Sequence, residues 1–320
     1  MAQMMGLVLP FFGLILLGVA AARITRQPAE ALGWLNTFVI YVALPALFFK
    51  LVSKTPVDQL KRFDFIVTAV ATTYVVFTAV FLIAFLVRRS GVAESTVQGL
   101  AGAYGNIGFM GPGLALLAFG EKAAVPLALI FCFENAVHFT VAPAMMAFAG
   151  GDRRPPLALA RDVGRKVLLH PFNLSTLVGV AAALAGWQPP LAMMRLVDSL
   201  AQAAAPCALF AMGVTLALRP LKRVPVEIGV IVPAKLVVHP LLMYLALGAA
   251  GSFDPVWVHT AVLLAALPTA TNVFVIAQQY HVWQERASAS VLITTVLSVA
   301  TVTGFLYLVT SGLLPADPFP

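Results

Sequence analysis

Apolar segments about as long as a bilayer is thick follow one another along most of the chain. A spanning helix needs about 20 mostly apolar residues, and charged or Pro/Gly-rich stretches divide this sequence into ten segments of that kind. We therefore predict an all-α integral membrane protein with ten transmembrane helices. The predicted spans are 4–22, 34–52, 65–87, 96–119, 123–149, 167–186, 191–218, 226–248, 256–280 and 287–311.

The composition leads to the same class of protein. Hydrophobic residues make up 61% of the chain and charged residues 10%, whereas about a quarter of the residues of a soluble domain are charged. Cys132 and Cys207 both fall inside apolar spans, which argues against a disulfide or a redox role. The sequence contains no cluster with metal-ligand spacing, so we expect neither a metal nor a cofactor.

The chain also reads as one unit written twice. Residues 10–22 (PFFGLILLGVAAA) match residues 171–183 (PFNLSTLVGVAAA) at a displacement of 161, and the same displacement sets Pro45 on Pro206. Prolines and glycines are poor filler inside helices, so their agreement favours a true repeat.

Three domains follow from this repeat. They are a first five-helix repeat (1–149), a cytoplasmic linker loop (150–166) and a second five-helix repeat (167–320). Because each half has an odd number of spans, the second half enters the membrane from the opposite side. Two inverted repeats are typical of secondary transporters.

Positive charges separate the two faces of the membrane. Of the 20 Lys and Arg residues, 13 fall in the loops after the first, third, fifth, seventh and ninth spans. By the positive-inside rule these loops are cytoplasmic, which puts both termini outside the cytoplasmic (inner) membrane. The net charge of +7 then reflects contact between basic loops and the lipid bilayer, and we expect no nucleic-acid partner.

Each half contains one stretch that a continuous helix would not tolerate well. GNIGFMGPG (105–113) has four glycines and a proline, and the window displaced by 161, ALPTATNVF (266–274), contains a proline beside polar residues. Each window holds one asparagine, Asn106 or Asn272, whose amide can bond backbone groups freed by a break. A packing kink is the alternative explanation for the Gly/Pro cluster.

Two half-helices that point their N-termini at a common site favour an anion there. An anionic substrate is therefore our hypothesis. The predicted substrate-binding residues are Asn106, Gly108, Gly111, Pro112, Lys235, Pro268, Thr269, Thr271 and Asn272.

Four ionisable residues fall near the middle of predicted spans, where each costs about 2.5–3.5 kcal/mol on insertion scales. Lys235 can attract a carboxylate directly, or it can pair with Glu134 as part of the scaffold. Glu134 and His138 share one helix face and can either carry a coupled proton or form a polar brace. His239, which precedes Pro240, is expected to bond a freed backbone carbonyl.

Several segments resemble the auxin efflux carrier family of membrane transport proteins, including its bacterial malonate-type carriers. The resemblance spans nearly the whole chain and rests on LNTFVIYVALPALFF, GNIGFMGPGLALLAFG, FENAVHFTVAP, AAAPCALFAMGVTLA, PAKLVVHPLL and ALPTATNVFVIAQQY. It implies a fold similar to that of sodium/proton antiporters, with broken, crossing helices in the fourth and ninth spans. It also implies a scaffold of the first, second, sixth and seventh spans, a moving transport domain and, often, a homodimer.

These patterns favour a carrier that moves a small organic anion, a mono- or dicarboxylate such as malonate, by alternating access. Plant members of the family usually place the proline one position after Pro112 and have a longer loop than 150–166, so auxin itself is not expected. The motifs of hydrolases and zinc proteases are missing from the sequence, so we expect no enzyme. An anion channel or a solute sensor stays open, as does coupling to a proton or to sodium.

Overall fold

The computed structural model describes residues 2–150, 157–158, 161, 164–165, 168–218 and 224–318. Over these residues the chain is helical, and its one β feature is an isolated bridge between Gly105 and Thr269. Six helical stretches are long and apolar enough to cross a membrane. The protein is therefore an all-α, multi-pass membrane protein. The six stretches are Glu30–Ser53, Phe63–Val87, Ile107–Phe148, Leu191–Leu218, Ile228–Ala250 and Gln284–Thr310.

The chain divides into two compact units, and each draws on both halves of the sequence. Unit 1 contains Met1–Arg62, Gly108–Cys132 and Leu168–Pro220, and unit 2 contains Phe63–Ile107, Phe133–Val167 and Leu221–Pro320. These units group segments that pack together, whereas the repeats at 1–149 and 167–320 are segments of similar sequence. The repeats therefore remain a prediction. Most of the predicted linker, 150–166, lies outside the described residues.

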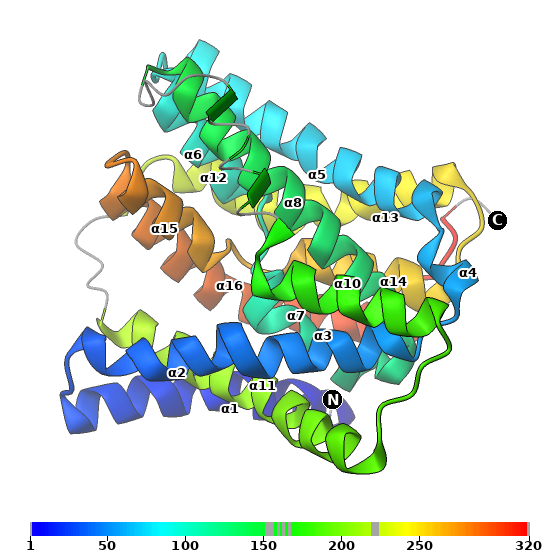
Figure 1. Cartoon of the computed structure of the whole chain (residues 1–320). Helices are drawn as coiled ribbons and strands as arrows, with labels where there is room; N and C mark the ends of the chain where they lie inside the picture. Colours follow the sequence, from blue (N-terminus) through cyan, green and yellow to red (C-terminus); the bar gives the residue numbers. More distant parts are fainter. Residues whose placement is uncertain are drawn as a thin grey trace. The chain divides into compact units, whose positions relative to one another are not determined.

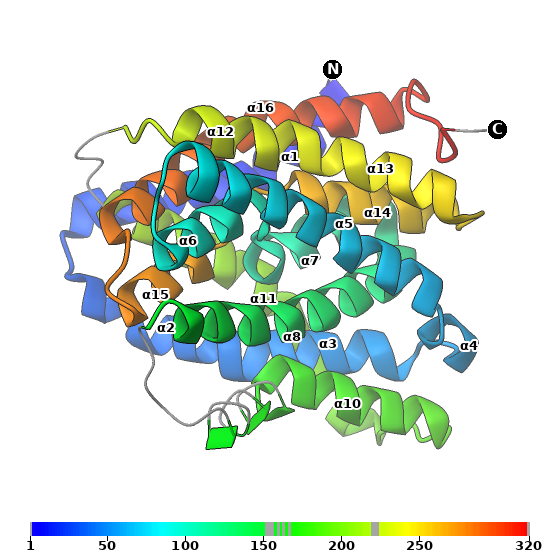
Figure 2. The same cartoon turned by 90° about the horizontal axis from the view of Figure 1, so that it is seen from above.

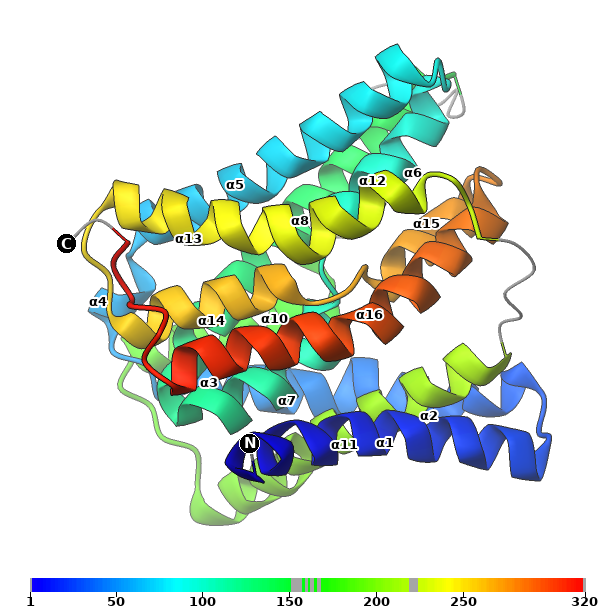
Figure 3. The same ribbon diagram turned by 180° about the vertical axis from the view of Figure 1, so that it is seen from behind.

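Unit 1 is built around four helical stretches. α1 packs along α11, α10 packs along α3, and α3 also contacts α11 (Figures 2 and 3). The ring of Phe48 on α3 stacks on the ring of Phe131, with centroids 4.8 Å apart. Phe172 of α10 packs against the same Phe131 ring, with centroids 5.1 Å apart. This aromatic cluster marks the side of α3 on which α10 lies. The elements are α1 (Ala2–Thr25), η1 (Ala29–Leu32), α2 (Gly33–Phe38), η2 (Val39–Ala43), α3 (Leu44–Ser53), α4 (Val57–Leu60), α7 (Ile107–Phe119), η4 (Gly120–Ala123), the first part of α8 (Ala124–Phe148), α10 (Pro171–Leu184) and α11 (Leu191–Leu218).

Two close helix contacts in unit 1 involve positions that the repeat makes equivalent. A methyl group on Gly18 of α1 would overlap the carbonyl oxygen of Phe210 on α11. A methyl group on Gly179 of α10 would lie 3.4 Å from the carbonyl oxygen of Phe49 on α3. Gly18 and Gly179 are 161 positions apart, and so are Phe49 and Phe210. The same pair of positions therefore meets in both helix pairs.

Unit 2 holds the remaining helices. α13 packs against α5 and α14, and α16 runs beside α14 and α15 (Figures 1 and 3). α6 and α14 each have 12 residues and begin 163 positions apart. The elements are α5 (Phe63–Leu82), η3 (Ile83–Val87), α6 (Val92–Ala103), the rest of α8, α12 (Ile228–Pro233), η5 (Ala234–Val238), α13 (His239–Ala250), α14 (Pro255–Ala266), α15 (Thr271–Gln279) and α16 (Gln284–Thr310).

A charged cluster joins the ends of four helices in unit 2. The buried carboxylate of Glu227, just before α12, accepts a hydrogen bond from Arg286 at 2.9 Å and pairs with Arg88 at 3.2 Å. Arg286 also reaches Glu94 of α6 at 3.3 Å. The loops after the third and ninth predicted spans, both predicted to be cytoplasmic, thus meet at the carboxylate of Glu227.

Candidate functional site: two interrupted helices in unit 2

Two interruptions of the helices in unit 2 pair with each other. Residues 104–106 separate α6 from α7, and residues 267–270 separate α14 from α15. Two backbone hydrogen bonds of 2.8 Å flank the Gly105–Thr269 bridge. Backbone groups that leave the helices therefore satisfy one another, as a membrane interior requires. The bonds run from Asn106 N–H to Pro268 O and from Ala270 N–H to Tyr104 O.

The first interruption is shorter than the glycine-rich window had suggested. Residues 107–119 form α7, with Pro112 inside that helix. Proline disfavours the helical conformation of the residue before it, partly through a clash with Cβ, and here that residue is Gly111, which has none. Gly108, Gly111 and Pro112 therefore belong to a continuous helix in unit 1 and lie outside the break.

The second interruption is tied to its neighbours by predicted site residues. Thr269 donates its hydroxyl proton to Ala101 O at 2.6 Å and its backbone N–H to Thr294 Oγ1 at 3.1 Å. Asn272, in the first turn of α15, donates from Nδ2 to the hydroxyl of Tyr104 at 2.9 Å. Thr271 begins α15 and is partly exposed.

Tyr104 connects both interruptions to α8, although it is not among the residues predicted from the sequence. Besides accepting from Asn272, its hydroxyl donates to Asn135 Oδ1. Its ring stacks on the imidazole of His138 with centroids 3.9 Å apart, and Tyr74 OH of α5 lies 2.8 Å from Nδ1 of the same imidazole. The available signal was an aromatic residue with a polar tip directly before the predicted break.

Lys235 is fully buried and lies at the first break. Its ammonium donates to the carbonyl of Ala265 in the last turn of α14. A methyl group on Gly105 would be 3.4 Å from Nζ. The position suits a cation because the last carbonyls of a helix lack helical partners and carry partial negative charge.

The expectation for His239 is wrong, because within the described residues both ring nitrogens face side chains and neither bonds a backbone carbonyl. Nδ1 lies 3.1 Å from Lys235 Nζ, and Nε2 lies 3.0 Å from Thr73 Oγ1. Thr73 in turn donates to Glu134 Oε1 at 2.6 Å. No direct ion pair joins Lys235 and Glu134 in the described part of the chain, so these two charges are connected through His239 and Thr73.

Glu134 and His138 are close, as their spacing predicted. His138 Nε2 lies 4.0 Å from Glu134 Oε2, and both side chains are buried. Nε2 has no hydrogen-bond partner among the described atoms. This geometry is compatible with either a polar brace or a site that exchanges a proton.

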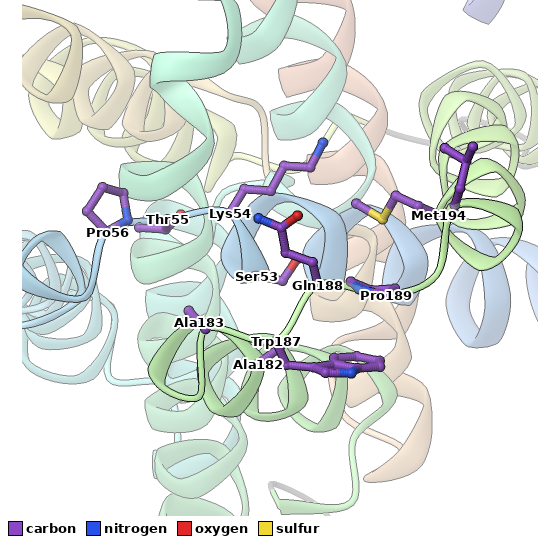
Figure 4. A pocket seen from close by; sticks show the side chains of 12 residues that line it. Ser53, Lys54, Thr55, Pro56, Ala182, Ala183, Trp187, Gln188, Pro189 and Met194 are labelled. Carbon is purple, nitrogen blue, oxygen red and sulfur yellow. The ribbon is translucent and has the colours of Figure 1, made fainter.

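A separate pocket of about 890 Å³ lies in unit 1 (Figure 4). It is formed where α3 and α10 end and α11 begins, and Lys54 is the charged residue in its lining. It contains none of the predicted substrate-binding residues. Its lining consists of Ser53, Lys54, Thr55, Pro56, Ala182, Ala183, Gly186, Trp187, Gln188, Pro189, Leu191 and Met194.

Comparison with known proteins covers both units. A family model described as membrane transport protein matches residues 3–306. The chain is 71% identical over 320 residues, the full length of both proteins, to the "Putative malonate transporter" of Rhizobium meliloti (strain 1021). It is 26% identical over 312 residues, or 94% of this chain and 96% of the relative, to the "Uncharacterized transporter YfdV" of Escherichia coli (strain K12).

Proposed function

Because this chain belongs to the membrane transport protein family, we propose that it is a secondary carrier moving a small organic anion across the cytoplasmic membrane by alternating access. Family membership itself makes the protein a transporter and not an enzyme. The proposed substrate is a mono- or dicarboxylate. The name of the relative with 71% identity places malonate first among the compounds to test.

The paired interruptions of unit 2 carry this proposal. Inverted-repeat carriers bind substrate where spanning helices are broken, and half-helix ends there supply unpaired backbone groups. Asn106, Asn272 and the ammonium of Lys235 lie on or beside the interruptions. We assign substrate contact to these side chains and to Thr271. Pro268 and Thr269 shape the second interruption, while Gly108, Gly111 and Pro112 shape the helix that follows the first.

We further propose that the ten predicted spans form two inverted five-helix repeats, 1–149 and 167–320, with both termini outside. The equivalent contacts of Gly18 and Gly179 support a common ancestral unit. The first, second, sixth and seventh spans all fall in unit 1, which is the set that the family resemblance assigns to a scaffold. Unit 2 is then the main part of the transport domain, to which the resemblance also assigns the stretch Gly108–Cys132 of unit 1. The resemblance also favours a homodimer.

Counterflow in liposomes tests the carrier proposal. Vesicles that contain the purified protein and unlabelled malonate are expected to take up labelled malonate faster than vesicles without internal malonate. A channel would give conductance without this stimulation, and a solute sensor would give neither. Stimulation by a neutral solute but by no carboxylate would contradict the proposed substrate class.

The buried charges can be tested in the same assay. We expect Lys235→Ala and Glu134→Gln to slow counterflow, because each leaves the other group as an uncompensated charge in the membrane. Lys54→Ala, at an exposed lysine of unit 1, is the control. If both variants transport at the wild-type rate, these two residues belong to the scaffold only.

A further inference from the structure

Four buried side chains of unit 2 form an unbroken line of polar contacts, which we call the 235–134 chain. Lys235 Nζ is 3.1 Å from His239 Nδ1, and His239 Nε2 is 3.0 Å from Thr73 Oγ1. Thr73 Oγ1 is 2.6 Å from Glu134 Oε1. All four residues are at most 3% exposed. The line therefore crosses from η5 and α13 through α5 to α8 inside the helix bundle.

The chemistry of these groups gives the 235–134 chain one direction. An ammonium has only donors, so His239 Nδ1 must accept from Lys235 and the ring proton must sit on Nε2. Nε2–H then donates to the hydroxyl of Thr73. That hydroxyl donates to the carboxylate of Glu134, which has only acceptors. Every proton along the chain points from the break toward α8.

We propose that the 235–134 chain is a proton relay that couples anion transport to one proton per cycle. Lys235, beside Gly105 at the break, is the end that meets the substrate site. Glu134, on α8, is the end that stores the proton. This inference rests on the proposed carrier function and adds the identity of the coupling ion.

The transfer conserves atoms and charge. Lys235 gives a proton to His239 Nδ1, Nε2 gives its proton to the Thr73 oxygen, and Thr73 gives its own proton to Glu134. Three N–H or O–H bonds break and three form. Lys235 becomes an amine, Glu134 a carboxylic acid and His239 the other neutral tautomer. A proton taken up at Lys235 then restores the ammonium, which turns toward the bound anion because His239 Nδ1 now carries a proton and no longer accepts. One additional proton is then left in the site.

Charge balance explains why this proton moves together with an anion. In the empty site the ammonium and the carboxylate sum to zero. An anion that carries one negative charge, such as malonate with one carboxyl protonated, adds that charge inside the membrane when it binds at the break, where an uncompensated charge is costly. The proton stored on Glu134 offsets that charge. A site loaded with only the anion or only the proton carries a net charge and crosses less readily.

Few titratable side chains face Glu134, which makes the 235–134 chain the main source of its proton. His138, on the same helix, is the titratable residue that also faces this carboxylate, with Nε2 4.0 Å from Oε2. Its Nδ1 faces Tyr74 of α5, and its ring is covered by Tyr104 of α6. No hydrogen bond or ion pair from another charged side chain reaches Glu134 in the described structure.

Thr73 gives the sharpest test, because a hydroxyl can be removed there with little change of shape. Thr73→Val interrupts the 235–134 chain, and Thr73→Ser keeps it. Thr72→Val is the matched control, since Thr72 is a neighbouring buried threonine whose hydroxyl donates to Thr68 O of its own helix at 2.8 Å. His239→Gln is a second interruption at another position, because an amide does not relay protons.

Two readouts on the same proteoliposomes separate coupling from transport. One is malonate counterflow at equal pH, and the other is malonate uptake driven by an alkaline lumen, with a trapped dye reporting lumenal pH. We expect the wild-type, Thr73→Ser and Thr72→Val proteins to accumulate malonate and acidify the lumen. Thr73→Val and His239→Gln should still show counterflow, at a reduced rate because the anion crosses without its proton, but should accumulate no more malonate than vesicles without a pH gradient.

The outcomes distinguish this inference from the function on which it rests. Counterflow without lumenal acidification in the wild-type protein would overturn the relay and leave the carrier intact. Acidification that survives in both Thr73→Val and His239→Gln would overturn it as well. If the wild-type protein shows no counterflow with any small carboxylate, the proposed function fails and the relay fails with it.

Discussion

A single hydroxyl, that of Tyr104, holds two amide side chains in unit 2. Tyr104→Phe would leave the amides of Asn272 and Asn135 without this partner while keeping the ring stacked on His138. A buried polar group left unsatisfied costs about 1–3 kcal/mol, and about 1.4 kcal/mol corresponds to a tenfold change in affinity. We expect the KM for malonate counterflow to rise by about tenfold, because Asn272 is a proposed substrate contact.

Tyr74→Phe is the matched control for that measurement. It also removes a phenol hydroxyl, that of a partly buried tyrosine, but among the described residues this hydroxyl bonds His138 and neither interruption. An equal rise of KM in both variants would mean that general loosening of the cluster, and not the Tyr104–Asn272 bond, is responsible. An unchanged KM in Tyr104→Phe would contradict a role for Asn272 in binding.

The residues of the candidate site differ in how visible they are in the sequence. Lys235 and Glu134 are conspicuous because a charge in an apolar span is costly. Thr73 is not, because hydroxyl side chains in membrane helices commonly bond their own backbone. Thr72 does so, whereas its neighbour Thr73 also reaches Glu134. Only the packing of α5 against α8 and α13 distinguishes two adjacent threonines.

Helix pairs in unit 1 depend on close backbone approach, and α1 offers a test with an internal control. Gly18→Ala would force a methyl group into the carbonyl oxygen of Phe210, whereas Gly13 of the same helix has no atom within 4 Å of its Cβ position. We expect Gly18→Ala to lower the melting temperature of the purified protein. Gly13→Ala should leave it unchanged or raise it, since alanine favours a helix by about 1 kcal/mol over glycine. Equal melting temperatures would show that α1 is free to move away from α11.

The approximate positions of the helices could be predicted from the apolar segments of the sequence. The positions of the two interruptions could be predicted only in part. The second one, at residues 267–270, falls inside the window that the repeat displacement selected. The first, at residues 104–106, only overlaps the start of its window, because Gly111 allows α7 to continue through Pro112 without a break. Residue type marks where a helix can break, and the mutual hydrogen bonds of the two segments determine where it does.

For the whole molecule, the two halves of the sequence do not correspond to the two compact units. α1 from the first half packs on α11 from the second, and α10 from the second packs on α3 from the first. Such an exchange cannot be read from a repeat in one sequence, because the repeat states which segments are alike and not which segments touch. The proposed inversion of the repeats therefore needs a direct test.

Gln27 and Gln188 provide that test, because they are exposed loop residues exactly one repeat displacement of 161 apart. If the repeats are inverted, these equivalent positions lie on opposite faces of the membrane. In a background with Cys132→Ser and Cys207→Ser, we expect a membrane-impermeant maleimide to label Gln188→Cys in intact cells. Gln27→Cys should be labelled only after the membrane is permeabilised, since its loop carries the arginines predicted to be cytoplasmic. Labelling of both positions from the same side would mean parallel repeats, and a pair of parallel repeats would not supply the symmetry on which the alternating-access proposal depends.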